Sequence, residues 1–202
     1  MPAHHLPPED LAAAKAAWRD RLTAARARVP LARLVEESAL TAGHLVDLPQ
    51  VRDAATVSAY VSVGHEPGTG LLIEALHQRG VRVLLPLVRP ERVLDWAAYD
   101  GPQSLAPARF GLLEPTTTTL GADAIGAADA VLVPALAVDP RGVRIGKGGG
   151  YYDRALTHVA ATTFTCAILR DDEIGLDLPT EPHDRAVGWA ASPTGVRELP
   201  LA

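Results

Sequence analysis

The chain has 202 residues, of which 48% are hydrophobic, and this composition can fill the core of one large domain. Acidic residues outnumber basic ones by 24 to 19, and the formal net charge of −5 argues against a general nucleic-acid coat. A single cysteine, Cys166, excludes an internal disulfide framework and a four-cysteine zinc site. We therefore expect a reducing, cytoplasmic setting.

The first residues, MPAHHLPPEDL, lack the charged start and the continuous apolar stretch of a signal peptide. No window of the sequence approaches the ~18 uninterrupted apolar residues that a membrane span needs. We expect a soluble protein with no membrane or nucleic-acid partner. The sequence contains no repeat, low-complexity tract or linker, so residues 1–202 are expected to form one domain, with residues 1–9 as a flexible tail.

Helical and extended segments alternate along the chain. Ala, Leu and Arg favour a first helix that begins at an Asp10 cap, and β-branched or continuous apolar runs mark the strands. The expected order is a helix over residues 10–29, a helix over 31–44, a turn at DLPQ, a strand over 56–63, a helix ending at Gly80, strands over 81–88, 93–99 and 129–136, a helix over 151–160, and strands over 162–169 and 186–192.

The strand–helix–strand order that surrounds Gly80 is typical of a βαβ unit. The segment DAVLVPAL (residues 129–136) is a continuous apolar run up to Pro134, as expected of a strand that is covered on both faces. These patterns predict an α/β fold, a three-layer α/β/α sandwich with a mostly parallel central sheet. The fold is Rossmann-like but has no dinucleotide fingerprint.

The segment DPRGVRIGKGGGYYDR (residues 139–154) combines many glycines with cationic side chains. Glycine lets backbone N–H groups approach a ligand closely, and successive N–H groups can form a concave anion site. Arg141, Arg144 and Lys147 supply positive charge. We interpret this segment as a phosphate-binding loop rather than as a flexible surface loop.

The loop differs from two common phosphate motifs. A Walker A loop has four residues between its glycines and a Ser or Thr after the lysine, whereas this chain has three residues and Gly148. A dinucleotide loop directly follows its strand, and here DPRGVRI intervenes. Asp153, just after the loop, fits equally well a helix-start residue and a ligand of Mg²⁺.

The run GxRxGxGGGYYDR resembles the signature of the 5-formyltetrahydrofolate cyclo-ligase family. Other segments of the chain occur in the family's order: KxxxR in the first helix, AYVSVGHEPGTGLLIEAL, VRVLLPLV, RFGLLEP and PHD (residues 182–184). The chain departs from the family at Val138, where Phe is usual, and at Ile145, where Leu is usual. The glycine loop is the specific part of this resemblance, and the joint order of the other motifs strengthens it.

The resemblance implies an enzyme that uses ATP and Mg²⁺ to convert 5-formyltetrahydrofolate into 5,10-methenyltetrahydrofolate, with release of ADP and phosphate. Phosphorylation of the formyl oxygen would make it a leaving group, and N10 of the folate would then attack the activated carbon. Both steps demand positioning and charge neutralisation. The resemblance implies a role in one-carbon metabolism, and we expect a monomer or weak homodimer in the cytoplasm.

The resemblance also implies roles for individual residues. Arg144 and Lys147 would offset charge on the transferring phosphoryl group, Asp153 and Asp184 would bind Mg²⁺, and Phe110 would form an aromatic wall for the folate. The residues expected at ATP are Lys15, Arg19, Arg144, Ile145, Gly146, Lys147, Gly148, Gly149, Gly150, Tyr151 and Tyr152. Those expected at the folate are Val61, Glu66, Lys147, Gly148, Gly149, Gly150 and Tyr151.

Several of these residues also have a purely structural interpretation. Lys15 and Arg19 could form a solvated helix face, and Glu66 could be a helix-start acid. Phe110 is expected a priori to be buried in the core, and His183 is expected to act through the neighbouring Asp184. Two other functions stay open: a non-catalytic nucleotide- or folate-binding protein, and a sugar-phosphate isomerase of similar architecture. The metal carboxylates argue against a simple binder, and an isomerase would not need ATP.

Overall fold

The structure is a computed structural model that describes residues 7–181 and 183–200. Its helices are α1 (Pro8–Ala27), α2 (Leu31–Asp47), α3 (Pro49–Arg52), α4 (Gly70–Gln78) and α5 (Tyr151–Ala155). Its strands are β1 (Thr56–Ser58), β2 (Arg82–Arg89), β3 (Val93–Ala98), β4 (Leu105–Pro107), β5 (Leu113–Pro115), β6 (Ala130–Pro134), β7 (Ala137–Val138), β8 (Arg144–Ile145), β9 (Phe164–Ile168), β10 (Trp189–Ser192) and β11 (Gly195–Glu198). Short 3₁₀ helices cover Pro90–Arg92, Pro102–Ser104, Arg109–Gly111, Ala122–Ala127, Leu156–His158 and Asp171–Glu173.

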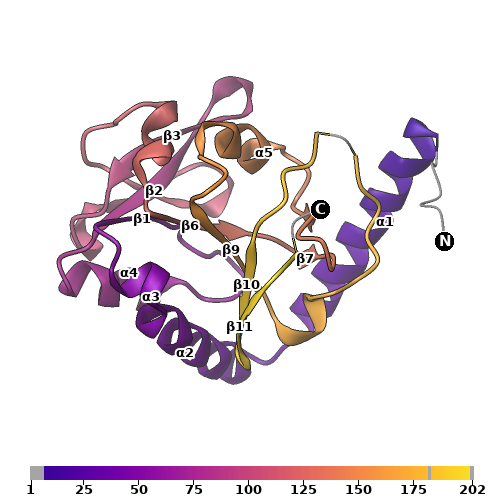
Figure 1. The fold of residues 1–202 in the computed structure, drawn as a ribbon, viewed down its shortest axis with the longest axis horizontal. Coiled ribbons are helices and arrows are strands. Elements are labelled where there is room, and N and C mark those ends of the chain that lie inside the picture. Colours follow the sequence, from indigo (N-terminus) through magenta and orange to yellow (C-terminus); the bar gives the residue numbers. More distant parts are fainter. Residues whose placement is uncertain (1–6, 182, 201–202) are drawn as a thin grey trace.

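A seven-stranded sheet with the order β11-β10-β9-β6-β1-β2-β3 forms the centre of the molecule (Figure 1). The strands from β10 to β2 pair in parallel, while β3 and β11 pair antiparallel at the two edges. This arrangement confirms the predicted α/β fold with a mostly parallel sheet. Two small antiparallel pairs, β4–β5 and β7–β8, lie outside the main sheet.

Helices cover both faces of the sheet, as the three-layer prediction requires. On one face, α2 and α4 pack through residues such as Leu45 and Leu76 against Val57 of β1. On the other face, α5 and the 3₁₀ helix Ala122–Ala127 pack against Trp96 of β3 and Val131 of β6. Strand β6 is buried along nearly its whole length, which explains its continuous apolar sequence.

The strand order reverses direction between β1 and β6. The chain passes from β1 through α4 to β2 on one side, and from β6 through α5 to β9 on the other. Because parallel crossovers are right-handed, crossovers that leave in opposite directions place their helices on opposite faces. The carboxyl ends of β1 and β6 therefore border a crevice, which is where open α/β sheets bind ligands.

Helix α1 lies beside the sheet rather than on one of its faces (Figure 1). Its sequence is only weakly amphipathic, and Leu22 is the buried α1 side chain in a small apolar cluster with Leu136, Ile145 and Leu178. The other buried side chains that α1 offers to this face are the cations Lys15 and Arg26. Charged contacts therefore contribute much of the attachment of α1.

Some element boundaries differ from the sequence-based expectation. Helix α1 begins at Pro8 after an extended Pro7, without a side-chain cap, so the expected Asp10 cap is wrong. Proline is favourable at the first helical position, where its missing N–H costs nothing. Residues 1–6 of the predicted tail lie outside the described residues, and its last two residues belong to α1 instead, so the tail prediction is wrong there. The expected turn at DLPQ contains the start of a short helix, α3, again with proline at its first position.

Strand β1 is shorter than predicted, and β11 was not predicted. Strand β1 ends at Ser58, and the residues soon after it, Tyr60, Val61 and Val63, line a cavity instead of continuing the sheet ladder. Strand β11 has the sequence GVRE, whose polar residues suit an exposed sheet edge and give little apolar signal.

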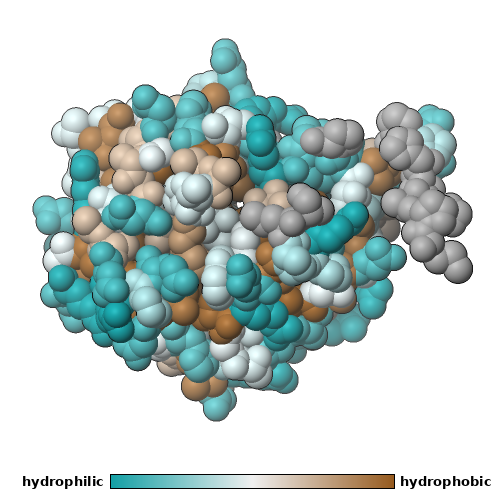
Figure 2. Space-filling model, viewed as in Figure 1, coloured by the Kyte–Doolittle hydropathy of each residue, from teal (hydrophilic) through white to brown (hydrophobic). Residues whose placement is uncertain are grey.

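Within the described residues, no helix combines the length and the apolar character needed to cross a membrane. Hydrophilic side chains cover most of the face shown in Figure 2, with apolar residues in small areas between them.

A buried ion pair joins α1 to the carboxyl end of the sheet. The Arg26 guanidinium donates to both oxygens of Glu173 at 2.7 Å and to the carbonyl of Ala135 at 2.7 Å. Glu173 also accepts from the backbone N–H of Arg170 at 2.9 Å. Both side chains are almost fully buried, so each charge depends on the other for compensation.

We expect Glu173→Gln to lower the free energy of unfolding by about 3–5 kcal/mol, because it leaves a buried guanidinium without its counter-charge. Urea denaturation measures this loss. Asp177→Asn, which removes a carboxylate from an exposed residue nearby, is the control and should change stability by less than about 0.5 kcal/mol. Equal effects of the two substitutions would show that the buried pair is not important for stability.

Candidate active site

A cavity of about 640 Å³ opens at the carboxyl ends of the parallel strands. Tyr60 and Val61 follow β1, Pro134 and Ala135 lie at the end of β6, and Pro86 belongs to β2, and all of them line the cavity. This is the crevice that the reversal in strand order creates. Helix α1, the glycine loop and the segment around Glu181 complete the walls.

The hairpin β7–β8 brings the glycine loop back over this crevice. Its turn is organised by Asp139, whose buried carboxylate accepts hydrogen bonds from the backbone N–H groups of Arg141 and Val143, both at 2.8 Å. The Arg141 guanidinium also donates to Asp139, at 2.9 and 3.0 Å. Arg141 is thus a structural partner of the turn, and of the two arginines in this hairpin it is Arg144 on β8 that lines the cavity.

The glycine loop (residues 146–150) adopts a backbone that needs glycine at particular positions. Gly148 has φ +92° and Gly150 has φ +66°, in the left-handed region. A Cβ on Gly149 would lie 2.5 Å from the ring of Tyr151. Arg19 of α1 lies against this loop, because its Nε donates to the carbonyl of Gly146 at 3.0 Å.

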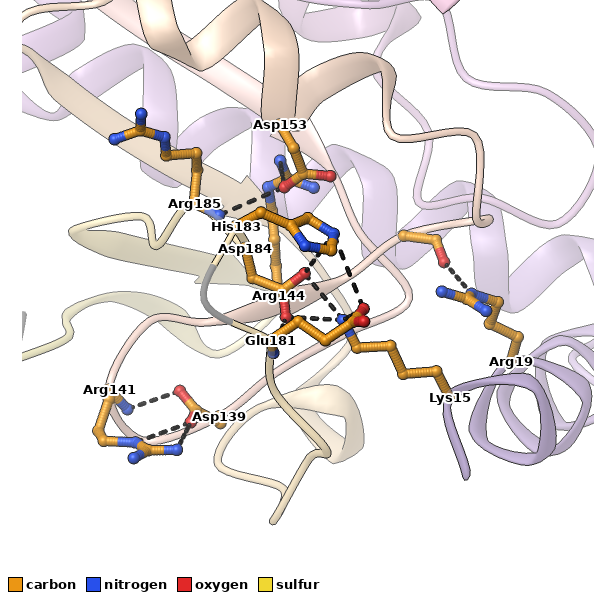
Figure 3. Close-up of polar contacts among 11 residues, drawn as sticks. Lys15, Arg19, Asp139, Arg141, Arg144, Asp153, Glu181, His183, Asp184 and Arg185 are labelled. Carbon is orange, nitrogen blue, oxygen red and sulfur yellow. Dashed lines mark hydrogen bonds and ion pairs between the residues drawn. The ribbon is translucent and has the colours of Figure 1, made fainter. Parts of the chain in front are cut away.

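Lys15 of α1 reaches a carboxylate cluster at the other end of the chain (Figure 3). Its Nζ lies 2.7 Å from Glu181 Oε2 and 2.7 and 2.8 Å from the two oxygens of Asp184. The His183 imidazole is close by, 3.7 Å from Glu181 and 4.0 Å from Asp184. The hydrogen bond from Lys15 lowers the pKa of the Glu181 carboxyl.

Arg144 pairs with Asp153, the acid at the start of α5, at 2.9 Å. Burial lowers the pKa of Arg144, and the charge of Asp153 opposes that effect. Asp153 also accepts from the backbone N–H of Arg185 at 3.3 Å. In the described part of the chain, the buried Arg144 Nε and the buried Tyr152 hydroxyl have no hydrogen-bond partner, although both residues line the cavity.

Lys147 and Glu66 form a third cation–carboxylate pair, with 2.7 Å between Lys147 Nζ and Glu66 Oε1. The other oxygen of Glu66 accepts from the backbone N–H of Val63 at 2.9 Å. Glu66 lies before α4, which begins at Gly70, so the interpretation of Glu66 as a helix-start acid is wrong. Its backbone bond instead fixes the carboxylate at the cavity wall.

The end of the cavity opposite α1 is apolar. Val61, Val88 and Leu94 line it, and Phe110 stands at its edge on the loop between β4 and β5. Phe110 is 79% exposed and has φ +60°, a backbone conformation that is uncommon for an aromatic residue. The alternative that Phe110 is buried in the core is therefore wrong.

Every predicted site residue lines this one cavity: Lys15, Arg19, Val61, Glu66, Arg144, Ile145, Gly146, Lys147, Gly148, Gly149, Gly150, Tyr151, Tyr152, Asp153 and Asp184. The structure thereby brings these residues together, and their individual roles stay predictions. Sequence reasoning missed Glu181, Arg26 and Tyr60, which also line the cavity. Glu181 had one available signal, an acid three residues before Asp184.

Comparison with known proteins gives the family. The sequence model of the 5-formyltetrahydrofolate cyclo-ligase family matches residues 11–193. This chain belongs to that family. A 5-formyltetrahydrofolate cyclo-ligase of Mycolicibacterium smegmatis is 48% identical over 143 residues, which cover 68% of this chain and 73% of the relative. The Escherichia coli enzyme of the same name is 30% identical over 160 residues, covering 78% and 88%.

Solved structures support the fold of the cyclo-ligase family. A 5,10-methenyltetrahydrofolate synthetase of Aquifex aeolicus has a TM-score of 0.79 and 23% identity, with 93% of this chain and 94% of that chain covered. The synthetase of Mycoplasma pneumoniae has a TM-score of 0.71 and 19% identity, covering 89% and 98%. The family predicted from the glycine loop is thus confirmed.

We expect Asp139→Ala to loosen the turn that positions the glycine loop, because several N–H donors lose their shared acceptor. Hydrogen bonds to charged groups contribute about 1.5–3 kcal/mol each, so the free energy of unfolding should fall by at least that amount. Amide hydrogen exchange in residues 140–150 should accelerate. Asp20→Ala, at an exposed position of α1, is the control. Unchanged exchange in the loop would contradict this role of Asp139.

Proposed function

We propose that this chain cyclises 5-formyltetrahydrofolate to 5,10-methenyltetrahydrofolate with consumption of ATP, and that the cavity described above is the active site. The enzyme class, 5-formyltetrahydrofolate cyclo-ligase, is confirmed by the family match and by the 48% identical relative. The use of ATP and Mg²⁺ and the residue roles are proposals. They rest on one observation: cations and carboxylates that lie far apart in the sequence line the same cavity.

The carboxylates at the α1 end fit a magnesium ion. One donor atom each of Glu181, His183 and Asp184 lies within 4.8 Å of the others. Mg²⁺ prefers oxygen ligands and usually keeps several waters, so a pair of carboxylates suffices to hold it. Asp184 and Glu181, together with Asp153 near Arg144, would hold the ion, which supplies positive charge to the phosphates when bound.

The cations and the glycine loop fit a triphosphate. Among residues 7–181 and 183–200, the buried Nε of Arg144 has no partner, and the Tyr152 hydroxyl is a second unpartnered buried donor. A phosphate oxygen would satisfy both groups. Gly148, Gly149 and Gly150 let the backbone approach closely where a Cβ would interfere. Lys15, Arg19 and Lys147 would neutralise the remaining charge.

The opposite end of the cavity fits the folate. Glu66 would accept hydrogen bonds from the amino and ring N–H groups of the pterin. Val61 and Leu94 offer an apolar wall for the ring system, and the exposed ring of Phe110 could stack on it. The formyl group would then lie beside the backbone of residues 147–151, between the two ends.

The chemistry requires the formyl oxygen to attack the γ-phosphorus, with ADP as leaving group. N10 then attacks the formyl carbon and releases its proton, the carbon–oxygen bond breaks, and inorganic phosphate leaves. Lys147 and Arg144 would stabilise the charge that develops on the transferring phosphoryl group, which is an electrostatic effect that a preformed site provides. The glycine loop would align the oxygen with the phosphorus and exclude water. A cytoplasmic location and a monomer or weak homodimer remain predictions.

The assay that tests this function follows the absorbance of the methenyl folate product with purified protein, 5-formyltetrahydrofolate, ATP and Mg²⁺. We expect an increase in absorbance that stops when any component is omitted, together with one ADP per product. Folded protein that gives neither product nor ADP would support a binding protein of the same fold. Conversion of a sugar phosphate without ATP would support an isomerase.

We expect Lys147→Ala to reduce kcat by about 10²–10³-fold, the usual effect of removing one donor from a preorganised charge site. The fold should remain intact, because the Lys147 side chain is 60% exposed. Circular dichroism tests the fold, and steady-state assays give kcat and KM. Arg28→Ala, which removes a cation from an exposed position just after α1, is the matched control. A kcat close to the wild-type value would contradict the electrostatic role of Lys147.

A further inference from the structure

Lys15 occupies the centre of the carboxylate group that fits a magnesium ion. Its Nζ lies 2.7 Å from Glu181 and within 2.8 Å of both oxygens of Asp184 (Figure 3). These distances are those of direct, charge-assisted hydrogen bonds. The ammonium and a divalent cation would therefore need the same oxygen atoms.

This ion pair is largely removed from solvent. Lys15 is 5% exposed, and the side chains of Asp184 and Glu181 are 8% and 28% exposed. Buried charges of one sign require a partner, so separating Lys15 from the two carboxylates is unfavourable unless another cation takes its place. A metal ion supplies that replacement.

Lys15 also lies next to the residues that would bind phosphate. Arg19, one turn further along α1, contacts the glycine loop through the carbonyl of Gly146. The lysine side chain is a flexible stem with rotatable donors, so its ammonium can turn from a carboxylate to a phosphate without movement of the helix. A shift of one side chain is enough to exchange its partner.

We propose that Lys15 and Mg²⁺ compete for the carboxylates of Glu181 and Asp184, so that Lys15 reaches the nucleotide only when the metal has replaced it. The inference rests on the proposed function. It assigns Glu181 as a positioning residue that holds Lys15 away from phosphate. As a consequence, the nucleotide would bind together with its metal ion. ATP without metal would leave both carboxylates uncompensated if it attracted Lys15.

The first experiment measures the affinity of the protein for Mn²⁺ in the absence of nucleotide, by a titration that is followed with electron paramagnetic resonance. We expect Lys15→Gln to bind Mn²⁺ at least about tenfold more tightly than the wild type, because the internal competitor is gone. Arg19→Gln is the matched control: it removes the same charge one turn away but leaves both carboxylates paired, and its effect should be much smaller. Equal Mn²⁺ affinity in Lys15→Gln and wild type would overturn the competition.

The second experiment measures ATP binding by calorimetry, in EDTA and in Mg²⁺. We expect Glu181→Gln to bind ATP in EDTA more tightly than the wild type by about tenfold, because Lys15 is held by one carboxylate fewer. For Glu181→Gln, the ratio of the ATP dissociation constant in EDTA to that in Mg²⁺ should therefore be smaller than for the wild type. A Glu181→Gln protein that binds metal-free ATP no better than wild type would overturn the role of Glu181, since a purely structural residue would give that result.

The two experiments separate this inference from the proposed function. Failure of the wild type to bind ATP in either condition would contradict the proposed function, yet the Mn²⁺ titration would still decide whether Lys15 competes with metal. If the wild type bound ATP with equal affinity in EDTA and in Mg²⁺, the proposed function would stand, but the proposed competition between Lys15 and Mg²⁺ would be overturned. If Lys15→Gln does not fold, the Glu181→Gln measurement decides alone.

Discussion

The neutralisation of buried charge is the constraint on which the rest of this structure depends. Helix α1 presents cations to the cavity, and each one has a partner from a distant segment: Lys15 with Asp184, Arg19 with the carbonyl of Gly146, and Arg26 with Glu173. Isolated charges would be unfavourable at these depths. The helix is therefore held in place by the same kind of groups that an anionic substrate would use.

Sheet topology determines where this charge is concentrated. The reversal of strand order between β1 and β6 opens a crevice at their carboxyl ends, and the β7–β8 hairpin carries the glycine loop across it. Asp139 fixes the hairpin turn, and β8 places Arg144 opposite Asp153. The same crevice is apolar where β2 and β3 border it, so one cavity offers a polar end for phosphate and an apolar end for a ring system.

The sequence predicted the parts of the site that are continuous in the chain or that belong to a specific motif. The glycine loop combines both properties, and its residues all line the cavity. Glu181 was missed because its importance depends on Lys15, which lies 166 residues away in the sequence. Arg26 and Glu173 were missed for the same reason. The end of β1 could not be predicted either, because Val61 and Val63 have strand-forming side chains but line the cavity instead of pairing.

Ion pairs in the cavity join residues from both ends of the chain, so the binding site forms only when the chain is fully folded. Groups proposed for phosphate are neutralised by groups proposed for metal or folate: Lys15 by Asp184, Arg144 by Asp153, and Lys147 by Glu66. Ligands would exchange these partners rather than meet unpaired charges, so the site is preorganised at low electrostatic cost. Lys15 comes from the first helix and Asp184 from a segment close to the last strands, so the site exists only when both ends of the chain have folded onto the same sheet.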